Sequence, residues 1–171
     1  ALRLEQARAL AAACRGRALF IVNDDALLAH AVGADGVHVG EDDGAVAEAR
    51  AIVGVGRIIG VSCYNELARA QRMAAEGADY LAFGSFYASS VKPLARRATP
   101  ALLHDARPLG LPLVAIGGIT AANAGAPITF SAATGCPSAN KSSVISPGCR
   151  RSSSSTSALL YLNPGRNSRL T

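Results

Sequence analysis

The sequence has no tryptophan, one methionine and only 5% aromatic residues. It also lacks an apolar run of the roughly 20 residues that cross a bilayer, so we expect no membrane partner. Its four cysteines, Cys14, Cys63, Cys136 and Cys149, have neither CxxC nor zinc-ligand spacing, which argues against a zinc site or a redox dithiol. Cys14 and Cys63 are expected to be small buried side chains of a cytoplasmic protein.

Acidic residues are absent from residues 125–171, although this segment holds five of the 17 lysines and arginines. Residues 1–124 hold twelve basic and twelve acidic residues, so the net charge of +5 comes entirely from the tail. A basic excess can indicate a nucleic-acid partner. The chain has no nucleic-acid motif and no aromatic residues between the basic ones, so we expect no such partner.

The tail is also compositionally unlike the rest of the chain. It contains eleven serines, and its apolar residues follow no sustained period of two or 3.6. Ser143-Val144-Ile145-Ser146 is only a weak strand pattern. We therefore predict an α/β domain over residues 1–124 and a low-complexity, disordered or aberrant tail over residues 125–171.

The stretch 19–43 organises the predicted domain as a strand, a helix and a second strand. The apolar run at 19–22 predicts a strand buried on both faces, and it is followed by Asn23-Asp24-Asp25. The second strand, 36–40, is followed by an acidic cluster that includes Asp43. Carboxylates at the same edge of a parallel sheet suit Mg²⁺. Spacing alone equally allows Asp24 and Asp43 to cap the helices that follow them.

Alternating strand and helix patterns continue to about residue 124. Strands are predicted at 19–22, 36–40, 57–62, 80–85 and 111–116, and helices at 4–14, 26–32, 45–52, 66–75 and 99–107. The sequence contains a weak internal repeat, in which a helix end is followed by a glycine and a strand start. Its two copies are Val32-Gly33-Ala34-Asp35-Gly36-Val37 and Glu76-Gly77-Ala78-Asp79-Tyr80-Leu81. This regular alternation of strands and helices predicts a parallel sheet. The absence of GxGxxG and the polar strand ends favour a (β/α)₈ TIM barrel over a doubly wound sheet.

Five motifs carry a resemblance to a known family. They are Val22-Asn23-Asp24, Gly36-Val37-His38-Val39-Gly40 with Asp43, Gly60-Val61-Ser62, Phe83-Gly84-Ser85-Phe86-Tyr87 with Lys92-Pro93, and Ala115-Ile116-Gly117-Gly118-Ile119-Thr120. In this order and spacing, residues 3–124 resemble the thiamine-phosphate synthase family. The resemblance implies an incomplete TIM barrel that lacks strands 1, 2 and 8. Its open sheet edges could then support self-association.

The resemblance also implies an activity and a set of roles. The family is a transferase of thiamine biosynthesis: it couples hydroxymethylpyrimidine diphosphate to thiazole phosphate and releases pyrophosphate. By this resemblance Mg²⁺ is the cofactor, with Asp24 and Asp43 as its ligands. The pyrimidine diphosphate is held by Asn23, Ser62 and Lys92, of which Lys92 and Ser62 are the catalytic pair. The thiazole phosphate is held by Ser89, Ser90, Val91 and Gly118, and Val91 lacks the hydroxyl of the threonine that the family usually has there.

Two alternatives stay open from the sequence. The chain could be a catalytically silent barrel fragment that retains phosphate and Mg²⁺ binding, as the missing strands suggest. It could also resemble the related thiazole tautomerase, which shares the scaffold. The acidic pair favours the synthase, because a tautomerase has no diphosphate to ionise.

Overall fold

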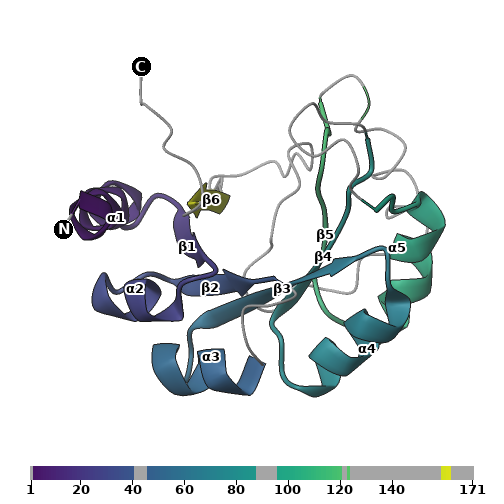
Figure 1. Ribbon diagram of the computed structural model, residues 1–171, viewed down its shortest axis with the longest axis horizontal. Coiled ribbons are helices and arrows are strands. Elements are labelled where there is room, and N and C mark those ends of the chain that lie inside the picture. The colour runs from purple at the N-terminus through teal and green to yellow at the C-terminus, as the bar shows by residue number, and fades with distance from the viewer. Residues whose placement is uncertain (1, 41–45, 88–95, 121–122, 124–158, 163–171) are drawn as a thin grey trace. The chain divides into compact units, whose positions relative to one another are not determined.

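A computed structural model describes residues 2–40, 46–87, 96–120, 123 and 159–162 of the chain (Figure 1). The chain divides into two compact units, one made of Ala1–Gly60 with Ser155–Thr171 and the other of Val61–Ser154. The boundary falls inside strand β3 (Ile58–Tyr64), so each unit contains part of that strand. Both units alternate helices with strands, as the sequence predicts.

The first unit has its strands in the order β3-β2-β1-β6. Along the chain its elements are α1 (Leu2–Cys14), β1 (Leu19–Asn23), α2 (Ala26–Ala31), β2 (Gly36–Val39), α3 (Val46–Val53), the first residues of β3, and β6 (Leu159–Leu162). β1 and β2 are parallel, with Ile21 opposite Gly36 and Asn23 opposite His38. Helices α2 and α3 pack on each other and cover the same face of β1 and β2 (Figure 1).

The core of the first unit is made by its strands. Phe20, Ile21 and Val22 are fully buried, and every residue of β2 is buried. This burial confirms the prediction that the apolar run at 19–22 forms a strand covered on both faces. Such strands need no polar alternation, because neither of their faces meets water.

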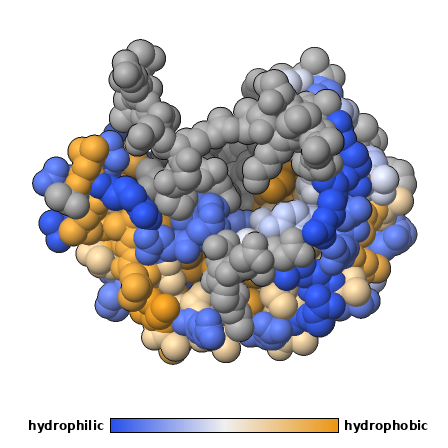
Figure 2. Space-filling view, in the orientation of Figure 1, coloured by the Kyte–Doolittle hydropathy of each residue, from blue (hydrophilic) through white to orange (hydrophobic). Residues whose placement is uncertain are grey.

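The second unit has the strand order β5-β4-β3. It contains the end of β3, then α4 (Leu67–Ala75), β4 (Tyr80–Phe83), α5 (Pro100–Ala106), the 3₁₀ turn η1 (Arg107–Leu109) and β5 (Leu113–Ala115). β4 and β5 are parallel, and α4 packs on both β4 and α5. Ala70 on the inner side of α4 is fully buried, whereas Figure 2 shows hydrophilic residues over the outer side of this helix.

The sequence repeat is a repeated helix stop. Gly33 and Gly77 both have positive φ, of 64° and 91°, which glycine adopts without a steric penalty. The next residue in each copy closes the same long-range turn: Ala34 N–H donates to Ala29 O at 2.9 Å, and Ala78 N–H donates to Met73 O at 3.0 Å. This is the Schellman arrangement. It ends α2 and α4 and starts β2 and β4 at equivalent places.

The tail contains one strand that the sequence reading missed. Leu159–Leu162 forms β6, which pairs in parallel with β1 from Leu19 to Val22. The prediction of a disordered or aberrant tail over residues 125–171 is therefore wrong for these four residues, since a short apolar run can pair with a neighbouring strand without any periodicity around it. The weak pattern at 143–146 lies outside the described residues.

Two smaller expectations concern cysteines and membranes. Cys14 and Cys63 are buried and unpaired in disulfides, as predicted, and Cys136 and Cys149 lie outside the described residues. Among the helices of the described residues, none is long and apolar enough to cross a membrane.

Candidate functional site

The end of β1 carries two polar residues in an unusual arrangement. Asn23 is the last residue of the strand and is only 5% exposed. Its Nδ2 donates a hydrogen bond to the carboxylate of Asp24, while its Oδ1 is buried and has no hydrogen-bond partner among the residues that the structure describes. Buried polar atoms almost always have a partner, so an unpartnered acceptor at a strand end makes this position a candidate for binding a ligand, an ion or a water.

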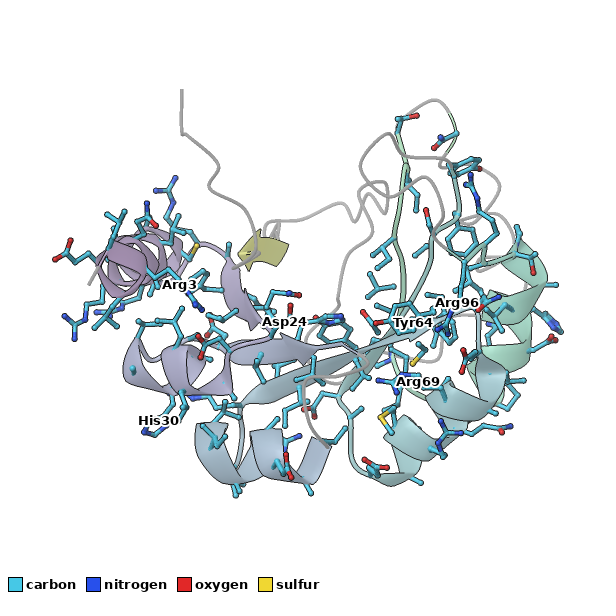
Figure 3. All side chains as sticks on the ribbon, in the orientation of Figure 1. Arg3, Asp24, His30, Tyr64, Arg69 and Arg96 are labelled. Atoms are coloured by element: carbon cyan, nitrogen blue, oxygen red, sulfur yellow. The ribbon has the colours of Figure 1, made fainter. Side chains whose placement is uncertain are left out.

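Asp24 itself does not cap the following helix. The N-cap of α2 is Asp25, whose Oδ1 accepts a hydrogen bond from Leu28 N–H at 2.8 Å and whose other oxygen pairs with Arg3. Asp24 has φ of 60°, a left-handed conformation that is uncommon for residues other than glycine, and its N–H donates to His38 O at 2.7 Å. The structure thus assigns capping to Asp25 and leaves the Asp24 carboxylate at the end of β1, where Figure 3 shows it.

These residues fit a hard divalent cation. Mg²⁺ binds oxygen ligands, and the carboxylate of Asp24 and the orphaned Oδ1 of Asn23 are both oxygen donors. The other predicted ligand, Asp43, lies outside the described residues. Within those residues no group of three or more His, Cys, Asp or Glu side chains gathers as a metal site by itself.

His38 is the second buried polar residue near this strand end. It is 2% exposed and lies opposite Asn23 in the β1–β2 register. Its backbone carbonyl holds Asp24, as described above. Its burial places the side chain in the core of the first unit.

In the second unit, Ser62 lies near the end of β3 and is half-buried. Its carbonyl accepts a hydrogen bond from Arg69 Nε at 2.8 Å. The Arg69 guanidinium carbon also lies 6.0 Å from the ring centroid of Tyr64, and that of Arg96 lies 5.4 Å from it. Arg96 is paired with Glu66. Figure 3 shows Tyr64 with the two arginines beside it.

The ends of β4 and β5 are tied together beyond the regular strands. Phe86 N–H donates to Ile116 O at 3.1 Å, and Tyr87 N–H donates to Gly117 O at 3.0 Å. A Cβ on Gly117 would lie 2.3 Å from Ser85 Oγ, so this approach requires glycine. The predicted phosphate-binding residue Gly118 follows it, with φ of 66°.

Asn123 fixes the turn that follows Gly118. Its Oδ1 accepts from Thr120 N–H at 2.7 Å, and its Nδ2 donates to Gly118 O at 3.0 Å. The Tyr87 hydroxyl donates to Asn123 O at 2.8 Å. The turn is therefore held from both sides at a strand end, which is where glycine-rich backbone can present N–H groups to a phosphate.

The structure places the predicted site residues as follows. Asn23 and Asp24 lie together in the first unit, and Ser62 and Gly118 lie in the second. Asp43, Ser89, Ser90, Val91 and Lys92 lie outside the described residues, so their roles stay predictions. The sequence reading missed Tyr64, Arg69, Arg96 and Asn123. The only sequence signal for them is a polar or basic residue shortly after a strand or at the edge of a motif, and many surface residues share that property.

Comparison with known proteins decides the family. The family model described as thiamine monophosphate synthase matches residues 1–137. The chain belongs to the thiamine monophosphate synthase family. The family resemblance read from the five motifs is thus confirmed.

Members of the family with high similarity include two bacterial proteins. The thiamine-phosphate synthase of Xanthomonas campestris pv. campestris (strain 8004) is 64% identical over 121 residues, which are 70% of this chain and 58% of that protein. The thiamine-phosphate synthase of Methylobacillus flagellatus is 58% identical over 120 residues, 70% of this chain and 57% of that protein. The chain therefore spans a little over half the length of these relatives.

A solved structure shows the same fold. Thiamine phosphate pyrophosphorylase from Pyrococcus furiosus matches with a TM-score of 0.66 and 35% identity, over 74% of this chain and 61% of that one. The match confirms the α/β fold with parallel strands for the family member described here.

Proposed function

We propose that this chain carries the active-site strands of a thiamine-phosphate synthase. The enzyme would couple hydroxymethylpyrimidine diphosphate to thiazole phosphate and release pyrophosphate. The observation that carries the proposal is the pair at the end of β1, where Asp25 and not Asp24 caps α2, and where a buried oxygen of Asn23 has no hydrogen-bond partner within the described part of the chain. Family membership supplies the reaction, and this pair supplies a place for its charged group.

The reaction needs no protein nucleophile. The bond between the pyrimidine methylene carbon and the diphosphate oxygen breaks, and its electron pair leaves with pyrophosphate. The thiazole nitrogen then donates its lone pair to that carbon and forms the new C–N bond. When bound, Mg²⁺ would neutralise the negative charge that builds on the leaving group. The protein's task is to position both substrates and to stabilise the separated charges.

Each residue has a task that suits its chemistry. Asp24, with Asp43, would hold the cation, and Asn23 would offer its oxygen to the same group. Ser62 would donate a hydrogen bond to the pyrimidine diphosphate, and Lys92 would provide a positive charge to the departing oxygens. The thiazole phosphate would bind Ser89, Ser90 and Val91 and the backbone at Gly118.

The same proposal extends to the architecture. We infer that the parallel strands belong to a (β/α)₈ barrel. Of the proposed site residues that the structure describes, Asn23 ends a strand, Asp24 and Gly118 follow one, and Ser62 lies near the end of one, which is where this fold places its chemistry. The match to the Pyrococcus furiosus protein and the repeated helix stops at Gly33 and Gly77 support it.

The test is a coupled assay of pyrophosphate release by the chain with both substrates and Mg²⁺. We expect release that depends on thiazole phosphate and on the metal, and that is lost in Asp24→Ala. The matched control is Glu48→Ala, which removes an exposed carboxylate from α3 in the same unit. Release that continues undiminished in Asp24→Ala would contradict the proposal.

One alternative is favoured by the coverage of the relatives. Because the chain spans 58% of the Xanthomonas protein, it could bind pyrophosphate and Mg²⁺ without turning substrates over. Calorimetric titration of pyrophosphate with Mg²⁺ separates the two cases. Tight binding with no release would identify a binding fragment, whereas binding with release identifies the synthase.

A further inference from the structure

Arg69 joins two residues at the end of β3. It lies on α4, the helix that follows β3, and its Nε reaches back to the carbonyl of Ser62 at 2.8 Å. Its guanidinium carbon lies 6.0 Å from the centre of the Tyr64 ring, within the range of a cation–π contact. Ser62 and Tyr64 are two residues apart at the end of β3, and one guanidinium contacts both: the backbone carbonyl of Ser62 and the ring of Tyr64.

A second arginine holds the same ring from another part of the chain. Arg96 lies 5.4 Å from the Tyr64 ring centroid and pairs with Glu66. Its backbone is also fixed, because Ser85 N–H donates to Arg96 O at 2.9 Å and Ala98 N–H donates to Ser85 O at 3.0 Å. The Tyr64 ring thus contacts one arginine from α4 and another that lies 32 residues further along the chain.

The backbone of Tyr64 explains why the strand end needs support. Its φ is 54°, a conformation that bulky side chains rarely adopt and that persists only where surrounding contacts impose it. Gly84 N–H donates to Tyr64 O at 2.9 Å and gives one such contact. The two arginines supply the other contacts to Tyr64. Arg69 also supports Ser62, through the hydrogen bond to the Ser62 carbonyl.

We propose that Arg69 is a positioning residue for Ser62 in the reaction. The hydrogen bond from its Nε–H to the Ser62 carbonyl fixes the position of the Ser62 backbone, and from that position the Ser62 hydroxyl reaches the diphosphate. The Tyr64 ring, which Arg96 also contacts, holds the Arg69 guanidinium in the place from which it makes that hydrogen bond. The inference rests on the proposed function, because it assigns Arg69 a task at the diphosphate-binding strand end, but the bond itself can be tested without substrate.

Pyrophosphate affinity in the presence of Mg²⁺, measured by calorimetry, provides the first test. Arg69→Met should weaken binding by about tenfold, the scale of loss expected when a binding group is displaced by a fraction of an ångström. Arg69→Lys keeps the charge but lacks the planar fork, so we expect it to lose nearly as much. Arg72→Met is the control, since it removes an exposed arginine from the same helix. It should bind as tightly as the unaltered chain.

The double variant shows whether Arg69 acts through Ser62. If it does, Ser62→Ala with Arg69→Met should bind pyrophosphate within about twofold of Ser62→Ala alone, because coupled residues give non-additive losses. Losses that multiply would overturn the inference, and so would full affinity in Arg69→Lys. Thermal unfolding of each variant shows whether a loss of pyrophosphate affinity comes only from a less stable protein.

A readout without ligand separates this inference from the proposed function. The Nε–H proton of Arg69 should exchange with water more slowly than that of Arg72, because it is held by a carbonyl. Equal exchange rates would overturn the inference even if the chain is an active synthase. If the Arg69 Nε–H proton exchanges slowly but the chain binds no pyrophosphate, the proposed function and the role of Arg69 in it are both rejected. Only the hydrogen bond between Arg69 and Ser62 is then supported.

Discussion

Phe20 and Asp35 exchange two hydrogen bonds between the starts of β1 and β2. Phe20 N–H donates to Asp35 Oδ2 at 2.8 Å, and Asp35 N–H donates to Phe20 O at 2.9 Å. The carbonyl of Asp35 also accepts from Ile58 N–H at 2.9 Å, at the start of β3. One aspartate therefore aligns the beginnings of three strands in the first unit.

This alignment predicts a stability effect. Asp35→Ala should lower the free energy of unfolding by about 1–3 kcal/mol, because it leaves the Phe20 N–H without its acceptor. Urea unfolding followed by circular dichroism measures the change. Glu48→Ala, an exposed position in the same unit, should change stability by less than about 0.5 kcal/mol. Equal effects at both positions would show that the Asp35 bonds do not hold the strands.

Asp24 and Asp25 should separate function from stability. Asp25→Ala removes the cap of α2 and should cost about 1 kcal/mol of stability with little effect on Mg²⁺-dependent pyrophosphate binding. Asp24→Ala should abolish the metal dependence of that binding while leaving the cap intact. Calorimetry and urea unfolding of both variants measure the two properties. The opposite pattern would mean that the metal lies at Asp25.

Gly36 allows β2 and β3 to approach each other closely. A Cβ at this position would lie 2.1 Å from the carbonyl oxygen of Ile58, so Gly36→Ala requires the backbone to move. We expect a loss of about 2–3 kcal/mol or more, from overpacking. Gly54→Ala is the comparison: Gly54 has φ of 90° but nothing within 4 Å of the added Cβ, so only the roughly 1 kcal/mol backbone penalty applies. A smaller loss at Gly36 than at Gly54 would contradict the close approach.

The stability of the protein should fall at alkaline pH because of Cys63. Burial raises the pKa of this thiol from 9.0 to about 11, against a smaller opposing effect of Arg69. Above pH 9 the unfolded chain loses the thiol proton before the folded chain does. The stabilisation is therefore complete below pH 9 and declines between pH 9 and 11.

Urea unfolding at pH 8, 9 and 10 tests this behaviour. The unaltered chain should lose stability more steeply with pH than Cys63→Ala, although the variant is less stable at pH 8 because of the cavity. Burial also raises the pKa of Tyr80, but that residue is present in both proteins and cancels in the comparison. Parallel pH profiles would show that the thiol does not titrate differently in the folded state.

The sequence predicted the strands well where an apolar run alone determines burial. The run at 19–22 and the glycine stops at Gly33 and Gly77 depend only on local chemistry, and the structure has them where they were expected. The sequence left open whether Asp24 caps α2 or binds a metal, and the structure gives the cap to Asp25. Both are good caps, and the choice depends on a backbone angle that only the folded chain fixes.

Contacts between distant residues were not predictable in the same way. The arrangement of Tyr64, Arg69 and Arg96 depends on a contact between residues 32 positions apart in the chain, which no sequence periodicity predicts. β6 was missed for a related reason, since Leu159–Leu162 becomes a strand through its pairing with β1. For the candidate site, the motifs supplied residues that stay predictions, and they gave no sign of the supporting residues Arg69 and Arg96.

The paired helix stops at Gly33 and Gly77 have a consequence for how this chain can change. They set where β2 and β4 begin, whereas the residues proposed for chemistry stand where strands finish. Stability and chemistry are thus assigned to opposite ends of the same strands. Side chains at the carboxyl ends of the strands can be substituted while the residues at the strand starts keep each strand in register. The substrate specificity of such a chain can therefore change while its fold stays the same.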